Sequence, residues 1–264
     1  MMRLKITPPH TVGPKENIIM NPTTKSQNNN KKSPYFKKRE IALWSGSVIL
    51  ILLSFLLFDR SNYMTLIASL IGVTSLIFCA KGNPVGQVLM ILFSILYGII
   101  SYGFAYYGEM ITYLGMTLPM AIFSLISWLR NPYGKNRSEV KVNHITIKET
   151  IFMCLLTAVV TAVFYFILEY FDTANLMPST ISVATSFAAA YLTFRRIPYF
   201  ALVYGMNDVV LIVLWVLAAM ENVRYISVVV CFIAFLVNDL YGYISWKKME
   251  KRQGRAASQE KHRA

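Results

Sequence analysis

The sequence is poor in charge and in the side chains that carry most catalytic and metal chemistry. Only 15% of its 264 residues are charged, and it has 3 Cys and 3 His. Cys79, Cys154 and Cys231 all fall in apolar stretches without paired spacing, which favours buried thiols over disulfides or metal ligands. No His has a Cys, a carboxylate or a second His at metal-ligand spacing, so no metal is predicted.

Motifs for phosphate binding and for hydrolysis are also missing. The sequence contains no glycine-rich P-loop and no recognisable arrangement of a Ser or Cys nucleophile with a His base. It therefore predicts neither an enzyme nor a pump that hydrolyses ATP, and it implies no cofactor.

Apolar residues are abundant instead. They make up 55% of the chain, and the mean hydropathy is +0.47. These values are typical of a membrane protein that crosses the bilayer several times. The net charge of +13 does not indicate nucleic-acid binding, because the basic residues flank apolar runs, where the positive-inside rule places them.

Eight apolar runs predict an all-α protein with eight transmembrane helices. Each run is close to the roughly 20 residues that a helix needs to cross the hydrocarbon. The runs lie at about 41–58, 63–80, 85–106, 110–129, 150–170, 178–194, 198–220 and 223–246.

The basic residues predict how the chain is oriented. If the N-terminus is cytoplasmic, all 26 Lys and Arg except Arg60 and Arg224 lie inside. This asymmetry predicts a plasma-membrane domain over 41–248 with an even number of spans and both termini in the cytoplasm. Residues 1–40 are polar and lack periodicity, which predicts a disordered basic tail, and 249–264 form a second basic tail.

Two pairs of short matches indicate an internal repeat. Ile126–Trp128 and Ile244–Trp246 both read Ile-Ser-Trp, at an offset of 118 residues. Lys81 and Arg195 each precede a proline by three positions, at an offset of 114 residues. The matches occur in the same order and with the same predicted orientation, so they indicate a duplication.

The duplication predicts two parallel repeats. They cover about 63–129 and 178–246, with the span at 150–170 as a linker helix and the first span outside the repeat. Transporters of the SWEET type are built from three plus one plus three helices in this way, around an axis along the membrane normal.

The seventh run contains the first candidate binding residues. Tyr204, Asp208, Leu211 and Trp215 follow helical spacing along one face, and Asn207 lies at its edge. An Asp at the centre of a spanning helix costs roughly 2.5 to 3.5 kcal/mol, which favours a substrate site. The alternative is a helix interface in which Asp208 bonds a neighbouring helix and the aromatic rings serve packing.

Spans eight and four add further candidates. Asn238 could bond a ligand, whereas Asp239 is interpreted as a structural or gating charge, able to pair with Lys247 or Lys248. Pro119 removes a backbone hydrogen bond at the middle of span four, which suits a hinge or a static bend.

Span three carries a polar stripe at helical spacing. Its members are Gln87, Met90, Ser94, Tyr97 and Ser101. Gln87 and Tyr97 could supply an amide and a ring to a cavity, whereas small hydroxyl residues such as Ser94 also serve ordinary helix association.

The acidic residues near the predicted outer loops look solvated. Their positions at the ends of apolar runs favour contact with water over a functional role. They are Glu109, Glu169, Asp172 and Glu221.

Residues 41–250 resemble the PnuC family of nicotinamide riboside transporters. The resemblance rests on Asn83-Pro84 before span three, the break at Tyr107–Glu109, Asn207, and the ending of span eight over 238–246. It implies a SWEET-like fold, often a homotrimer, and facilitated diffusion of nicotinamide riboside. A cytoplasmic nicotinamide riboside kinase would then phosphorylate the substrate and trap it.

The resemblance also implies a site in which aromatic rings stack on the pyridine and Gln and Asn side chains bond the amide and ribose. Gln87, Asn207 and Asn238 match this pattern in type and approximate place. A tryptophan expected near the start of span six is absent, because the chain reads Met-Pro-Ser-Thr over 177–180. Trp215 or Tyr97 would have to replace that ring.

Three other functions remain open from the sequence. Relatives of similar design carry thiamine or riboflavin, so the substrate could be another vitamin. Asp208 and Asp239 would suit a proton-coupled carrier. A membrane sensor or assembly factor that binds partners through its basic tails would need no substrate cavity.

Overall fold

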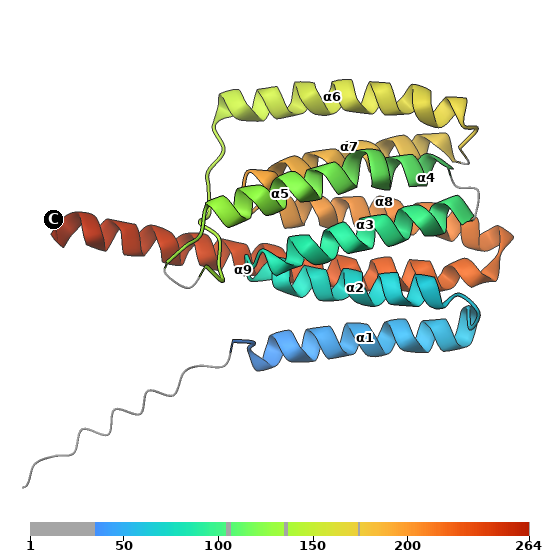
Figure 1. Cartoon of the computed structure of the whole chain (residues 1–264), viewed down its shortest axis with the longest axis horizontal. Coiled ribbons are helices and arrows are strands. Elements are labelled where there is room, and N and C mark those ends of the chain that lie inside the picture. Colours follow the sequence, from blue (N-terminus) through green and yellow to red (C-terminus); the bar gives the residue numbers. More distant parts are fainter. Residues whose placement is uncertain (1–34, 104–106, 135–136, 174, 264) are drawn as a thin grey trace, which may run out of the picture. The chain divides into compact units, whose positions relative to one another are not determined.

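The chain is built from helices joined by short connections, in the computed structural model that describes residues 35–103, 107–134, 137–173 and 175–263 (Figure 1). The helices are α1 (Lys38–Phe58), α2 (Tyr63–Ala80), α3 (Val85–Gly103), α4 (Tyr107–Ile111), η1 (Thr112–Thr117), α5 (Leu118–Arg130), α6 (Ile147–Tyr170), α7 (Leu176–Phe194), α8 (Phe200–Glu221), η2 (Val223–Tyr225) and α9 (Ile226–Arg263). They confirm the prediction of an all-α protein. Most of the predicted N-terminal tail, residues 1–34, lies outside the described residues.

Seven helical segments of the described chain are long and apolar enough to cross a membrane. They are α1, α2, α3, the continuous segment from α4 to α5, α6, α8, and η2 with α9. The eighth predicted span, at 178–194, is helical as α7 but is not among them, because its Ser and Thr residues lower its hydropathy. The structure therefore shows a multi-pass membrane protein with seven candidate spans.

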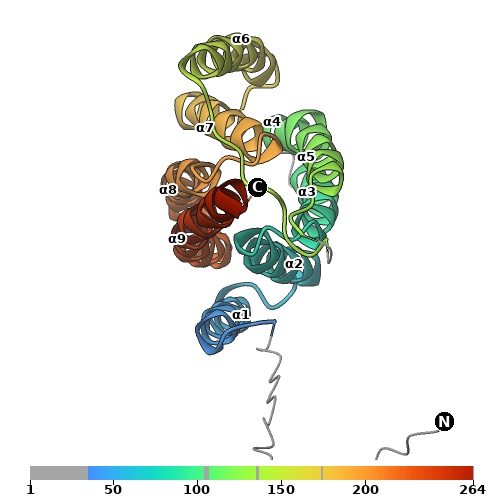
Figure 2. The same ribbon diagram turned by 90° about the vertical axis from the view of Figure 1, so that its left-hand side faces the viewer.

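The helices of the compact unit Phe36–Ala264 form a ring with two peripheral members (Figure 2). In the ring α2 packs on α3, α3 on α5, α5 on α7, α7 on α8, α8 on α9, and α9 on α2. At the periphery α1 packs against α2 and α9, and α6 packs against α7. We call the end that bears the C-terminal part of α9 the basic end. The far end bears the turns from α1 to α2, from α6 to α7 and from α8 to α9 (Figure 1).

Two tryptophans close the ring near the basic end. Trp128 of α5 donates its indole N–H to the carbonyl of Thr193 on α7 at 2.9 Å. Trp246 of α9 donates to the carbonyl of Cys79 on α2 at 2.8 Å. Both side chains are fully buried, and their ring centroids lie 5.4 Å apart. Each indole thus joins the last helix of one predicted repeat to the first helix of the other.

Ion pairs tie the two peripheral helices to the ring at the same end. Lys81, directly after α2, binds Glu40 of α1 with an N–O distance of 3.1 Å. Arg195, directly after α7, binds Glu149 of α6 at 2.5 Å. The helices α1 and α6 therefore hold equivalent places beside the first helix of each predicted repeat.

The connection from α5 to α6, described over 131–134 and 137–146 and called segment 131–146 below, pairs with both turns of the basic end. The Val140 amide donates to the carbonyl of Gly82 at 2.9 Å, and the Asn143 amide donates to the carbonyl of Arg196 at 3.0 Å. Gly82 and Arg196 have φ angles of 65° and 60°, the left-handed conformation that commonly ends a helix. The Val140 side chain is fully buried, so the segment packs into the bundle end.

The extension of α9 holds this segment in place through Gln253. Its side-chain N–H group donates to Glu139 Oε1 at 2.8 Å and to the Val140 carbonyl at 3.0 Å. Its Oε1 accepts the Val142 amide at 2.9 Å. Arg252 forms a more exposed ion pair with Glu139. The predicted tail at 249–264 thus begins as a helical continuation of α9 that contacts the bundle.

The fourth predicted span changes its helical winding near Pro119. The π-helical turn η1 immediately precedes α5, where Pro119 occupies the first turn. A proline has no N–H to donate to the preceding turn, so a wider turn there accommodates it. The expected irregularity at Pro119 is present, whereas its gating role stays a prediction.

Candidate functional site

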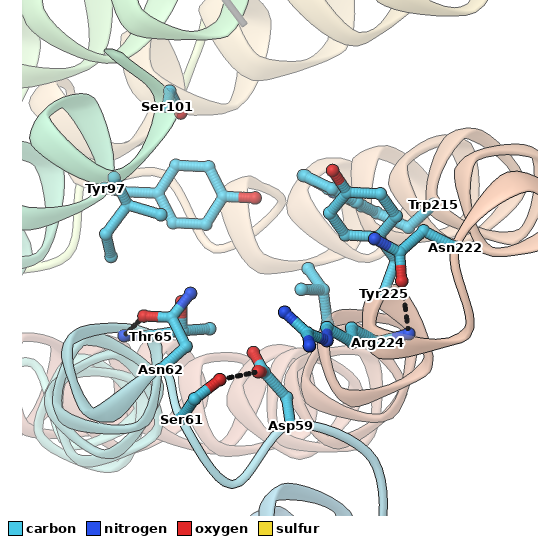
Figure 3. Close-up of a pocket in the computed structure, with 12 residues that line it drawn as sticks. Asp59, Ser61, Asn62, Thr65, Tyr97, Ser101, Trp215, Asn222, Arg224 and Tyr225 are labelled. Carbon is cyan, nitrogen blue, oxygen red and sulfur yellow. Dashed lines mark hydrogen bonds between the residues drawn. The ribbon is translucent and has the colours of Figure 1, made fainter. Parts of the chain in front are cut away.

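A cavity of about 270 Å³ lies at the far end, between the turn from α1 to α2, α3, α8 and the start of α9 (Figure 3). Its walls combine aromatic rings with short polar side chains and two opposite charges. The lining residues are Asp59, Ser61, Asn62, Thr65, Tyr97, Ile100, Ser101, Trp215, Asn222, Arg224, Tyr225 and Val228. Tyr97 and Trp215 were predicted for a site, so the structure brings these two together.

Two asparagines shape the rim of the cavity. The Asn62 side chain accepts the Thr65 amide at 3.2 Å and caps α2. The Asn222 side chain accepts the Arg224 amide at 3.1 Å and caps η2. Asparagine is a preferred capping residue because its short side chain bonds a free amide of the first turn. Each turn is therefore stabilised by a local hydrogen bond from its own asparagine.

Charged and polar groups face the space between these turns. Asp59 is 8% exposed and accepts a weak hydrogen bond of 3.4 Å from Ser61, and Arg224 approaches from the opposite turn (Figure 3). The Thr65 hydroxyl oxygen is buried and has no hydrogen-bond partner among the described residues. A buried hydroxyl without a partner is costly, so it is suited to bond a ligand.

Aromatic rings continue from the cavity into the bundle. The Tyr97 ring lies edge-on to Trp215, with centroids 6.5 Å apart, and the centroid of the Tyr225 ring lies 5.4 Å from that of Trp215. Tyr113 lies 4.3 Å from Tyr97. Such a series offers ring faces on which a planar heterocycle can stack.

Deeper in the bundle, the two aspartates of the predicted dyads meet. Asp208 of α8 and Asp239 of α9 lie near each other, and both are at most 5% exposed. The salt bridges of the described residues give Asp239 no lysine partner, and Lys247, one of the two lysines considered for it, binds Glu250 at 2.6 Å. The burial of Asp239 at the α8–α9 contact keeps its carboxyl group away from the interface with water.

Comparison with known proteins places this architecture. The family model described as nicotinamide mononucleotide transporter matches residues 62–248. This range contains all of α2, α3, α5, α6, α7 and α8 and the first part of α9. The chain belongs to the nicotinamide mononucleotide transporter family. The predicted relationship to PnuC proteins is confirmed, and because the family is one of transporters, the prediction of a transporter rather than an enzyme is confirmed with it.

Two curated relatives and one solved structure resemble the chain. The nicotinamide riboside transporter PnuC of Neisseria mucosa is 24% identical over 199 residues, which cover 74% of this chain and 76% of the relative. The PnuC protein of Haemophilus influenzae is 23% identical over 193 residues, covering 72% and 82%. A crystal structure of the vitamin B3 transporter PnuC has a TM-score of 0.72 at 22% identity, over 83% of this chain and 94% of that one. The structural likeness shows that the fold is shared.

Within this family fold, the predicted amides join neighbouring helices. Asn207 Oδ1 accepts hydrogen bonds from Ser182 at 3.3 Å and from Thr185 at 2.8 Å, both on α7. Asn238 donates to Ser47 of α1 at 2.8 Å and is 2% exposed. A substrate that used these amides would have to replace bonds between helices, so their role as ligands stays a prediction.

The other predicted residues lie away from the cavity of Figure 3. Gln87 is 3% exposed and donates to Cys79 Sγ at 3.4 Å, and the fully buried Ser94 hydroxyl donates to the Met90 carbonyl at 2.8 Å. Tyr204 packs with Phe200 near the basic end, at a centroid distance of 6.3 Å. Their assignment as site residues also remains a prediction.

Asp59, Asn62 and Arg224 were missed because they lie in the short connections between spans, and Thr65 because it lies in the first turn of α2. Sequence reasoning concentrated on polar residues inside apolar runs, where burial is expensive. The signal that could have identified the turns is the capping pattern at Asn62, together with the only two basic residues of the predicted outer loops, Arg60 and Arg224.

Proposed function

We propose that the protein carries nicotinamide riboside across the plasma membrane by facilitated diffusion. Membership of the transporter family and the names of two relatives support this substrate. The observation that carries the proposal is the aromatic cavity at the far end. Tyr97, Trp215 and Tyr225 offer ring faces to a pyridine, while Thr65 and Asp59 offer polar partners to a ribose or an amide.

The proposed orientation places the basic end in the cytoplasm and both termini with it. The distribution of Lys and Arg supports this orientation, since Arg60 and Arg224 alone lie in turns of the far end. The cavity then faces the outside, and segment 131–146 covers the cytoplasmic end. The structure is thus consistent with an outward-facing, substrate-free state of the carrier.

Substrate would pass from this cavity to the deeper predicted residues when the bundle rearranges. In alternating access the two repeats rock about a site near the membrane midplane. We assign Asn207, Gln87 and Asn238 to that deeper site, with Tyr204 and Asp208 beside them. Opening of the basic end would then require segment 131–146 to separate from the turns that it pairs with.

We infer that the fold is a SWEET-like pair of parallel repeats, α2 to α5 and α7 to α9, with α6 between them. Two equivalent contacts support this inference. The bonded pairs Trp128 with Thr193 and Trp246 with Cys79 repeat the offsets of 118 and 114 residues found in the sequence. The ring contacts of α5 with α7 and of α9 with α2 are equivalent in the same way. If α7, which packs against α5, α6 and α8, also crosses the membrane, the seven candidate spans become eight.

Two features of the proposal rest on the family resemblance. A homotrimer would cover part of the lipid-facing surface, and a cytoplasmic nicotinamide riboside kinase would trap the carried nucleoside by phosphorylation. Phosphorylation adds negative charge to the nucleoside, and the phosphorylated product no longer fits the carrier's route, so uptake becomes one-way without an ion gradient.

The decisive experiment is uptake of labelled nicotinamide riboside by proteoliposomes that contain the purified protein. We expect saturable uptake that stops at equal concentrations inside and outside, and competition by unlabelled nicotinamide riboside but not by thiamine or riboflavin. Preferred competition by either vitamin would overturn the substrate assignment. Flux no greater than that of protein-free liposomes would favour a sensor or assembly factor.

A proton-coupled carrier is a second candidate, because Asp208 and Asp239 lie near each other away from water. A proton shared between two neighbouring carboxyl groups would relieve the repulsion of like charges. This candidate predicts that an inward proton gradient drives nicotinamide riboside above its outside concentration. Facilitated diffusion predicts no accumulation under the same gradient.

A further inference from the structure

A second cavity, of about 150 Å³, lies at the far end between α4, the turn from α6 to α7, and α8. Its lining residues are Tyr107, Gly108, Glu109, Phe171, Asp172, Thr173, Asn175, Ser179, Leu214, Trp215, Ala218 and Glu221. Three of them are acidic, and none is Lys, Arg or His. The walls described for this cavity therefore carry charge of one sign.

Glu109 departs from its predicted state. The expectation that it is solvated is wrong, because it is only 8% exposed, whereas Asp172 and Glu221 are exposed as expected. Gly108 lets α4 pack closely at this point. A Cβ there would lie 2.4 Å from the Thr173 hydroxyl oxygen and 2.6 Å from the Leu168 side chain of α6, so both side chains would have to shift.

The Glu109 carboxylate has no partner in the part of the chain that the structure describes. It makes no hydrogen bond or ion pair with a described residue, and it lines the cavity directly. A buried carboxylate without a partner is costly, and such groups usually meet a ligand, an ion or a functional partner. This unpartnered, nine-tenths buried group distinguishes the cavity from an ordinary acidic surface.

Aromatic rings surround the same carboxylate. Trp215 lines this cavity and also the cavity of Figure 3, so its indole forms a common wall. Tyr107 and Phe171 line this cavity as well, with ring centroids 6.2 Å apart. A carboxylate combined with ring faces binds a flat organic cation, because each contributes attraction to positive charge.

We propose that Glu109 recognises the positive charge of the substrate's pyridinium ring, with Trp215 as the ring surface beside it. This inference rests on the proposed function, since the pyridine nitrogen of nicotinamide riboside bears a positive charge through its bond to ribose. Glu109 thereby makes the carrier selective for cationic over uncharged nucleosides. The ribose would extend toward the polar side chains of the neighbouring cavity.

The test compares nicotinamide riboside with its reduced dihydro form, which has nearly the same shape but no charge. Binding of both is measured on the purified full chain by calorimetry. We expect Glu109→Gln to weaken binding of the cation by about 10- to 100-fold, the size expected for one lost charge-assisted contact in a buried site. Binding of the uncharged form should change less than about threefold, which also shows that the variant is folded.

The matched control is Glu169→Gln, which removes an exposed acid near the end of α6 that does not line the cavity. We expect it to leave the preference for the cation unchanged, because water screens an exposed charge. Equal loss for both ligands in Glu109→Gln, or no loss for either, would overturn the proposal. If Glu109→Gln does not fold, Glu109→Asp serves instead, because its shorter side chain moves the carboxylate away from the cavity. Unchanged selectivity in Glu109→Asp would also overturn the proposal.

An inorganic cation is the other possible source of the charge. Repeating the measurements in sodium, potassium and choline buffers separates the two. A requirement for sodium or potassium that disappears in Glu109→Gln would assign the carboxylate to that ion and refute recognition of the ring. Failure of the wild-type chain to bind either nucleoside would instead refute the proposed function itself.

Discussion

Replacement of Gln253 by alanine tests whether segment 131–146 closes the basic end. The substitution removes three hydrogen bonds and leaves the Val142 amide and the Val140 carbonyl without this partner in a buried setting. An unsatisfied buried group costs about 1 to 3 kcal/mol, and an ordinary hydrogen bond contributes about 1 kcal/mol net. We therefore expect the segment to detach more easily by about 2 to 4 kcal/mol.

Detachment can be measured by the reactivity of a buried position. Val140 is fully buried, so a Val140→Cys probe reacts with a membrane-impermeant maleimide only when the segment opens. The 3 native cysteines are replaced by alanine in this background. When opening is faster than labelling, Gln253→Ala should raise the labelling rate by about 30-fold or more, because each 1.4 kcal/mol is a factor of ten.

Arg252→Ala is the matched control on the same turn of α9. Arg252 binds Glu139 through an ion pair in which the arginine side chain is 60% exposed. Exposed pairs of this kind contribute about 0 to 1 kcal/mol, so labelling should rise less than about fivefold. Equal labelling rates in the Gln253→Ala variant and in its parent would refute the reasoning. A larger effect of Arg252→Ala would show that charge, not the buried amide, holds the segment.

Three further variants test other parts of the bundle. Trp246→Phe should lower the free energy of unfolding by about 0.5 to 1.5 kcal/mol, because the Cys79 carbonyl loses the indole N–H and keeps the Gly82 amide; a thermal melt in detergent with unchanged stability would contradict this. Trp215→Ala should raise the substrate concentration for half-maximal uptake about tenfold, and a normal value would remove the indole from the site. Asp208→Asn should change uptake equally with and without a proton gradient, whereas in a proton-coupled carrier it would abolish the gradient-driven accumulation specifically.

The sequence alone was sufficient to predict the membrane class, the helices and the family. Hydrocarbon requires long apolar helices, so each span is visible as a run of apolar residues, and basic residues mark its ends. The Ile-Ser-Trp matches at Trp128 and Trp246 were visible for a similar reason. Both tryptophans have to satisfy one N–H group in a fully buried place, and the structure shows them doing so in equivalent ways.

Only the tertiary structure decided which polar residues face one another. Helical spacing places Asn207 and Asp208 at a depth in the membrane, but it does not say which neighbour each one meets. Asn207 meets Ser182 and Thr185, whereas Asp208 meets Asp239. A one-residue step on a helix turns a side chain by about 100°, so adjacent residues contact different helices.

The burial of Glu109 shows the same limit in the short helix α4. Its position at the end of an apolar run suggested contact with water, and hydropathy cannot report that Gly108 lets α4 pack closely against α6. The length of an apolar run and the charges that flank it are properties of one segment, so they can be read directly from the sequence. Whether a carboxylate is solvated, paired or left to face a cavity depends on surfaces from several helices, and these meet only in the folded bundle.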